Sequence, residues 1–98
     1  MRIIKWNSQA KLDYYQNIDY LLERWSEVEA QKFIKQVSEI EFILRQGDIY
    51  YQDTDYTNVK RCLINRQITL FYLIEDSENI EFLRFLNNRK NINDLKFD

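Results

Sequence analysis

Six cationic side chains in the second half of the chain are its clearest candidates for chemistry. They are Lys60, Arg61, Arg66, Arg84, Arg89 and Lys90. Guanidinium groups suit phosphate and carboxylate oxygens, because their planar donors can bind two oxygens at once. Several of them on one surface would hold RNA or an acidic protein partner. The same half also carries many Asp and Glu residues, so ordinary solvated surface charge is the competing interpretation.

The residue types exclude several kinds of site. The chain has no His, which removes imidazole proton transfer, Ser-His-Asp triads and His-ligated metals. Its single cysteine, Cys62, cannot form an internal disulfide or a multi-thiolate metal site, and we expect it in the core. The run Asp53-Thr54-Asp55 lacks the glycine and distal glutamate of a calcium loop. We therefore expect neither a metal nor a cofactor.

Three tyrosines lie together in a polar stretch, at Tyr50, Tyr51 and Tyr56. Such rings can stack on bases or form a groove for a partner, because tyrosine offers contact area at low entropic cost. More often, such tyrosines simply pack a loop against the rest of the domain.

Length and composition favour one compact domain over residues 1–98. Of these residues 45% are hydrophobic and 31% are charged. Fourteen Lys and Arg against sixteen Asp and Glu give a net charge of −2, so no global positive field attracts nucleic acid or a membrane. No apolar run approaches the ~20 residues that span a bilayer. With one cysteine and no signal-like start, we expect a cytoplasmic protein.

The periodicity of apolar residues predicts a strand, two helices and three strands. The predicted ranges are a strand over Arg2–Trp6, a helix from Ala10 to Trp25, a second helix from Ser26 to Gly47, a connecting loop over Asp48–Asn58, strands over Val59–Ile64, Ile68–Glu75 and Ile80–Leu86, and a tail over Asn91–Asp98. The short polar breaks between the last three strands predict two antiparallel hairpins.

Both helices show one apolar stripe at helical spacing. The stripes are Ala10, Tyr14, Ile18, Leu21, Leu22 and Trp25 on the first, and Ala30, Phe33, Ile34, Val37, Ile40 and Leu44 on the second. Asn7 and Ser8 supply cap chemistry for the first helix, Ser26 and Glu29 fit a capping box, and Gly47 is placed to end the second helix. Trp25 is placed to pack onto Ala30 as a hydrophobic staple.

The fold class that follows is α+β, with a two-helix hairpin on a small, mainly antiparallel sheet. In the strand over Ile68–Glu75, Phe71 and Leu73 alternate with other apolar residues, so both of its faces are apolar and the strand is central. The helices can cover one face only. The other face is predicted to form an open concave surface that includes Arg61 and Arg84.

Several local phrases resemble the RelE/ParE superfamily of bacterial toxins from type II toxin–antitoxin modules. They are Ile18-Asp19-Tyr20-Leu21-Leu22-Glu23-Arg24-Trp25-Ser26 with Ala30, Val59-Lys60-Arg61-Cys62, Leu70-Phe71-Tyr72, and Asn88-Arg89 followed by Asn91 and Leu95. Their order and spacing cover nearly the whole chain. The resemblance is closest to the ParE-like branch, often labelled plasmid stabilisation proteins.

The resemblance implies a toxin that is neutralised by a cognate antitoxin. Characterised ParE toxins bind and inhibit DNA gyrase, whereas the RelE branch cleaves mRNA in the ribosome. A toxin that has lost its activity and only binds antitoxin is a third possibility. Toxins of this size without their partner expose apolar surface, so self-association into a homo-oligomer is a further expectation.

The RNase pattern of the RelE branch is only partly matched here. Its first lysine matches Lys60 and its last arginine matches Arg89, but its second lysine falls at Cys62, its central arginine at Thr69 and its tyrosine at Leu95. If the chain is a nuclease, the resemblance implies Lys60 and Arg89 as catalytic residues, with Arg61, Arg66 and Arg84 as substitutes. The missing residues favour a non-enzymatic inhibitor instead. The residues expected to bind the partner are then Arg61, Arg66, Arg84 and Arg89.

Overall fold

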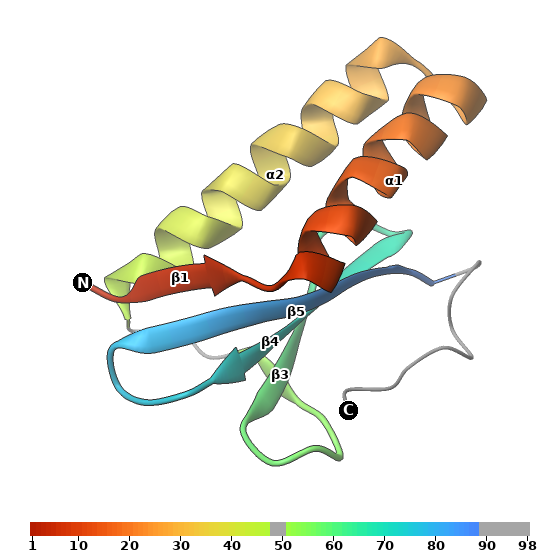
Figure 1. The fold of residues 1–98 in the computed structure, drawn as a ribbon. Coiled ribbons are helices and arrows are strands. Elements are labelled where there is room, and N and C mark those ends of the chain that lie inside the picture. Colours follow the sequence, from red (N-terminus) through yellow and green to blue (C-terminus); the bar gives the residue numbers. More distant parts are fainter. Residues whose placement is uncertain (48–50, 89–98) are drawn as a thin grey trace.

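The chain folds into two helices packed on one five-stranded sheet, as a computed structural model shows for residues 1–47 and 51–88 (Figure 1). The elements are β1 (Ile3–Trp6), α1 (Ser8–Arg24), α2 (Glu27–Gln46), β2 (Gln52–Asp53), β3 (Val59–Leu63), β4 (Ile68–Ile74) and β5 (Asn79–Asn87). The predicted α+β class and the order of the long elements are confirmed.

The sheet has the order β1-β5-β4-β3-β2. β3, β4 and β5 form the two predicted antiparallel hairpins, and β1 runs parallel to β5, pairing Ile3 with Asn79 and Trp6 with Phe82. A register shift between Phe71 and Tyr72 marks a bulge in the pairing of β4 with β5. β1 is much shorter than β5, so the second half of β5 has no strand neighbour on that side.

The residues that the sequence predicts as helix caps stand at the observed helix boundaries. The side chain of Asn7 accepts from the backbone N–H of Ala10 at 2.7 Å, and Ser26 Oγ accepts from the N–H of Glu29 at 3.2 Å. Each cap satisfies a donor that the helix leaves unpaired. Gly47 follows α2 with φ of 89°, in the left-handed region that glycine enters without a Cβ clash.

The main core lies between the helices and the sheet. Its largest fully buried side chains are Tyr72, Phe33, Phe82, Phe85 and Leu44. A second, smaller cluster of Val59, Phe71 and Leu86 lies on the opposite face of the sheet. β4 therefore has apolar residues on both faces, as its sequence predicts for a central strand.

Three sequence predictions require correction. The stretch predicted as loop contains β2, whose Gln52 and Asp53 pair with β3; two polar residues carry no hydrophobic pattern, so only the neighbouring strand defines them. Leu22 and Ile34, predicted to be core, are exposed. Trp25, the last residue of the predicted stripe on the first helix, is 57% exposed. A helix packs on the core through only part of its apolar stripe, so residues at the edges of the stripe remain exposed to solvent.

No helix in the described ranges, 1–47 and 51–88, is long and apolar enough to cross a membrane. Tyr50 and the tail over Asn91–Asp98 lie outside these ranges.

We predict that Gly47→Ala lowers the free energy of unfolding by about 1 kcal/mol, because alanine is strained at this positive φ. An added Cβ would make only an ordinary 3.6 Å contact with Arg2 Nε, so the effect should come from the backbone. Urea denaturation would measure it. Gly47→Asn should lose less, since asparagine tolerates this conformation, and Gln46→Ala is the matched control. Equal stabilities for all four proteins would contradict the prediction.

Candidate functional site

The face of the sheet away from the helices carries a hollow of about 320 Å³. Its lining consists of Gln52, Arg61, Leu63, Thr69, Phe71, Leu86, Asn87 and Asn88. Apolar side chains from three strands form part of it, and amide side chains lie where β5 ends. The sequence predicts an open surface on this face, and the structure places a hollow there.

Arg61 is the predicted site residue that the structure places in this hollow. It lies two residues after Val59 on β3, and residues two apart in a strand point to the same face, so Arg61 shares the open face with Val59 and its apolar cluster. Its Nε donates to Gln52 Oε1 at 3.1 Å. Within the described part of the chain no carboxylate lies within ion-pair distance of Arg61. Its other guanidinium donors are therefore suited to an external anion.

Thr69 lies on the same face, where the RNase pattern has an arginine. Its hydroxyl donates to Asn88 Oδ1 at 2.8 Å, and Asn88 Nδ2 donates to the carbonyl of Arg66 at 3.3 Å. These bonds connect the end of β5 to the start of β4 and to the turn between β3 and β4. A neutral hydroxyl used in this way cannot stabilise charge on a phosphate as an arginine does.

Lys60 does not join Arg61. Alternation along β3 places it on the same side as the buried Cys62, towards the helices, and its ammonium is paired with Asp53 of β2. The structure therefore separates the two neighbouring cations of the predicted site onto opposite faces of the sheet.

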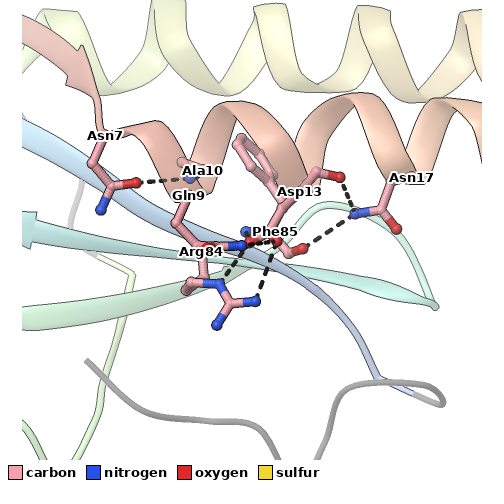
Figure 2. Close-up of polar contacts among 7 residues, drawn as sticks. All are labelled: Asn7, Gln9, Ala10, Asp13, Asn17, Arg84 and Phe85. Carbon is pink, nitrogen blue, oxygen red and sulfur yellow. Dashed lines mark hydrogen bonds and ion pairs between the residues drawn. The ribbon is translucent and has the colours of Figure 1, made fainter. Parts of the chain in front are cut away.

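Arg84 does not lie on the open surface that the sequence predicts for it. Its Nε donates to Asp13 Oδ2 at 2.7 Å and its Nη2 to Asp13 Oδ1 at 3.2 Å, and the guanidinium-bearing side chain is only 18% exposed (Figure 2). The pair joins β5 to α1. This bidentate geometry commits Arg84 to a structural ion pair and leaves it poorly placed for a partner.

The sequence analysis did not identify Asp13 and Asn17, the two α1 residues of this network. Asp13 Oδ2 also accepts from the backbone N–H of Phe85 at 3.1 Å, and Asn17 Nδ2 donates to the carbonyl of Phe85 at 3.1 Å (Figure 2). Gln9 Nε2 adds a further donor to Asp13 at 3.0 Å. The available signal was that Asp13 and Asn17, four residues apart, fall on the buried stripe of α1, where polar residues need partners.

Arg66 does not join Arg61 in the open-face hollow. Arg66 lines a separate hollow of about 280 Å³ that also includes Trp25 and Gln67, beside the turn between the helices. Arg89 lies outside the described residues. Of the three described arginines that were predicted to bind a partner, Arg61, Arg66 and Arg84, only Arg61 lines the open-face hollow.

A cluster of neutral side chains lies on the face of the sheet that the helices cover. It consists of Tyr51, Cys62 and Tyr72. Burial raises the pKa of the Cys62 thiol to about 11 and that of Tyr72 to about 12. Burial, followed by the neighbouring thiol, also raises the pKa of Tyr51. Tyr72 accepts from the backbone N–H of Tyr51 at 3.4 Å. Cys62 is thus a core residue, as predicted, and not an activated nucleophile.

No group of three potential metal-binding side chains occurs in the part of the chain that the structure describes.

No protein-family model and no curated protein matches the sequence. Solved structures do match it in three dimensions. A chain of the chromosomal ParDE toxin–antitoxin system of Pseudomonas aeruginosa aligns with a TM-score of 0.68 at 18% identity, over 89% of this chain and 96% of that one. A copper-bound mutant toxin from Helicobacter pylori gives 0.66 at 15%, over 92% and 98%. Staphylococcus aureus YoeB gives 0.60 at 18%, over 87% and 94%.

Because these identities are low, the likeness concerns the fold. The chain has the RelE/ParE-like toxin fold that the sequence resemblance implies.

We predict that Asp13→Ala lowers the free energy of unfolding by about 3 to 5 kcal/mol, because it leaves the Arg84 charge and the Phe85 N–H without their buried acceptor. Chemical denaturation would measure the loss. Asp19→Ala, an exposed change on the same helix, should stay within about 0.5 kcal/mol. A loss below 1 kcal/mol for Asp13→Ala would show that the network is not needed for stability.

We also predict that Cys62 resists thiol labelling in the folded protein. With its pKa raised to about 11, the thiolate fraction at pH 8 falls by about 100-fold relative to an ordinary cysteine, and burial slows access further. Reaction with Ellman's reagent at pH 8 should be at least that much slower than in guanidinium chloride. Rapid labelling without denaturant would contradict this assignment.

Proposed function

We propose that this chain is the toxin of a type II toxin–antitoxin module in the RelE/ParE superfamily. The fold supports this proposal, together with the sequence phrases around Trp25, Lys60 and Leu70. The alignments cover nearly the full length of the matched toxins, so the correspondence is between whole folds.

The partner in this proposal is a cognate antitoxin. Among the structural neighbours, YafQ of Escherichia coli is in complex with DinJ, and S. aureus YoeB is in complex with YefM. In this chain the open face of the sheet offers an apolar floor around Phe71 and Leu86, with Arg61 beside it. Apolar area with one charged anchor is typical of a protein-binding surface.

The molecular activity that we propose is binding and inhibition of DNA gyrase, as in ParE toxins. The observation that carries this choice is the composition of the open-face hollow. Within the described residues it holds one cation, Arg61, while Lys60 is paired with Asp53 on the other face and Thr69 is bonded to Asn88. A cleavage mechanism that needs several converging cations is poorly supported by this arrangement.

The test is gyrase supercoiling with ATP, titrated with the purified, antitoxin-free protein. We expect inhibition with trapped, cleaved DNA. Arg61→Ala should raise the half-inhibitory concentration by about tenfold, the effect of one well-placed interface side chain. Lys35→Ala, an exposed cation on α2, is the matched control and should change nothing.

Two results would redirect the assignment. No inhibition by folded protein in large molar excess would exclude gyrase and leave ribosome-dependent mRNA cleavage, to be assayed with Lys60→Ala and Arg89→Ala. If neither assay responds, and if induction without antitoxin does not slow growth, the chain is a toxin that has lost its activity and retains only antitoxin binding.

A further inference from the structure

A second hollow, of about 300 Å³, lies on the helix side of the molecule, away from the open-face hollow. It is lined by Trp6, Lys11, Tyr14, Tyr15 and Glu41. Trp6 ends β1, the two tyrosines and Lys11 belong to α1, and Glu41 belongs to α2. Tertiary packing thus brings three elements together here, where the helices lie side by side over the sheet (Figure 1). None of these residues lines the open-face hollow.

Three aromatic rings dominate the lining. The rings of Trp6 and Tyr14 lie 5.0 Å apart at 88°, and those of Tyr14 and Tyr15 lie 5.3 Å apart at 75°. Trp6 and Tyr14 also pack against Phe85 of the core, with ring centroids 5.1 and 5.8 Å away, so the exposed ring of Tyr15 is the one most open to a ligand. The faces of aromatic rings carry negative potential and attract cations, most strongly at tryptophan.

Glu41 adds a carboxylate to this aromatic group. Its Oε2 accepts from Trp6 Nε1 at 3.3 Å and from Arg45 Nη2 at 3.4 Å. In the described part of the chain no donor is bonded to its other oxygen, Oε1. The field of Glu41 reaches the hollow, because after burial and Tyr15 it also raises the pKa of Tyr14. A further cationic donor in the hollow would therefore find a carboxylate oxygen close to the exposed ring of Tyr15.

Two cations of the chain lie at or beside this hollow: Lys11 is part of its lining, and Arg45 is paired with Glu41 Oε2. Lys11 is exposed, and its long side chain can turn to solvent while its stem stays in place. Arg45 meets Glu41 as an i,i+4 pair with a half-exposed guanidinium, a geometry that gives a weak interaction.

The surroundings of the hollow favour a polypeptide over a free ion. Its lining combines the rings of Trp6, Tyr14 and Tyr15 with the carboxylate of Glu41, and Tyr15 is 63% exposed. Large apolar side chains beside a charged anchor are the composition of protein-binding surfaces.

We propose that the hollow formed by Trp6, Tyr14, Tyr15 and Glu41 receives the guanidinium group of an arginine side chain presented by a partner polypeptide. An arginine fits better than a lysine, because its planar group can stack on a ring while its edge donates to the carboxylate. This site is independent of the gyrase assignment.

The chain's two tryptophans provide the readout. The indole N–H signals of Trp6 and Trp25 can be followed by ¹⁵N NMR, and Trp25 lies in a different hollow, so it serves as an internal reference. The probe is N-acetyl-arginine-N-methylamide at constant ionic strength. We expect a saturable shift of Trp6, with a dissociation constant in the millimolar range, and a stationary Trp25. N-acetyl-citrulline-N-methylamide, which has the same shape without the charge, should produce little change.

Two substitutions, at the partly exposed Glu41 and the exposed Tyr15, test whether these side chains bind the arginine probe. Glu41→Gln should weaken arginine binding by about tenfold, because the donor loses a charged acceptor. Glu39→Gln, two residues away and exposed, is the matched control and should bind normally. Tyr15→Ala should also weaken binding and, since the ring is exposed, should leave the fold intact.

Three results would overturn the proposal. They are the absence of a saturable Trp6 shift, an equal response to the citrulline probe or to tetramethylammonium, and unchanged binding in both Glu41→Gln and Tyr15→Ala. None of these measurements uses gyrase, ribosomes or growth. A failure here is therefore distinguishable from a failure of the proposed function.

Discussion

The carboxylate of Asp13 is the interaction on which the rest of the arrangement depends. β1 ends at Trp6, whereas β5 continues to Asn87, so the backbone of β5 at Phe85 pairs with β4 on one side and has no strand neighbour on the β1 side. Asp13 accepts from that N–H and from Arg84. Buried backbone groups need partners, and an α-helix can replace a strand only by offering side chains. The ion pair therefore fixes α1 against the edge of the sheet.

Fixing α1 in this way decides what the two faces of the sheet can do. One face is covered by both helices and buries the rings of Phe33, Tyr72 and Phe85. The other face has no second layer among the described elements, and carries the smaller cluster around Phe71. A single covered face concentrates the core on one side and leaves apolar area with Arg61 on the other, where a partner can bury it.

The same constraint explains why the cations do not act together. Alternation along β3 sends Lys60 and Arg61 to opposite faces, and the edge of β5 uses Arg84 for structure. Each cation then meets a different environment: Lys60 a carboxylate on β2, Arg61 an amide at the rim of the open hollow, and Arg84 the buried Asp13. These three cations therefore do not converge on one site.

Hydrophobic periodicity and cap chemistry determined much of this protein from the sequence alone. They placed both helices, β1 and the three long strands, the start of α2 at Ser26 and its end at Gly47, and the two apolar faces of β4, because these signals are local and repeat at 3.6 or 2 residues. β2 and the roles of Asp13 and Arg84 were decided only by the tertiary structure. Two polar residues become a strand only beside β3, and Asp13 and Arg84, 71 positions apart, meet only when α1 lies on β5. Charge by itself marks a residue as important, but it does not say whether the partner is solvent, another protein or the chain's own backbone.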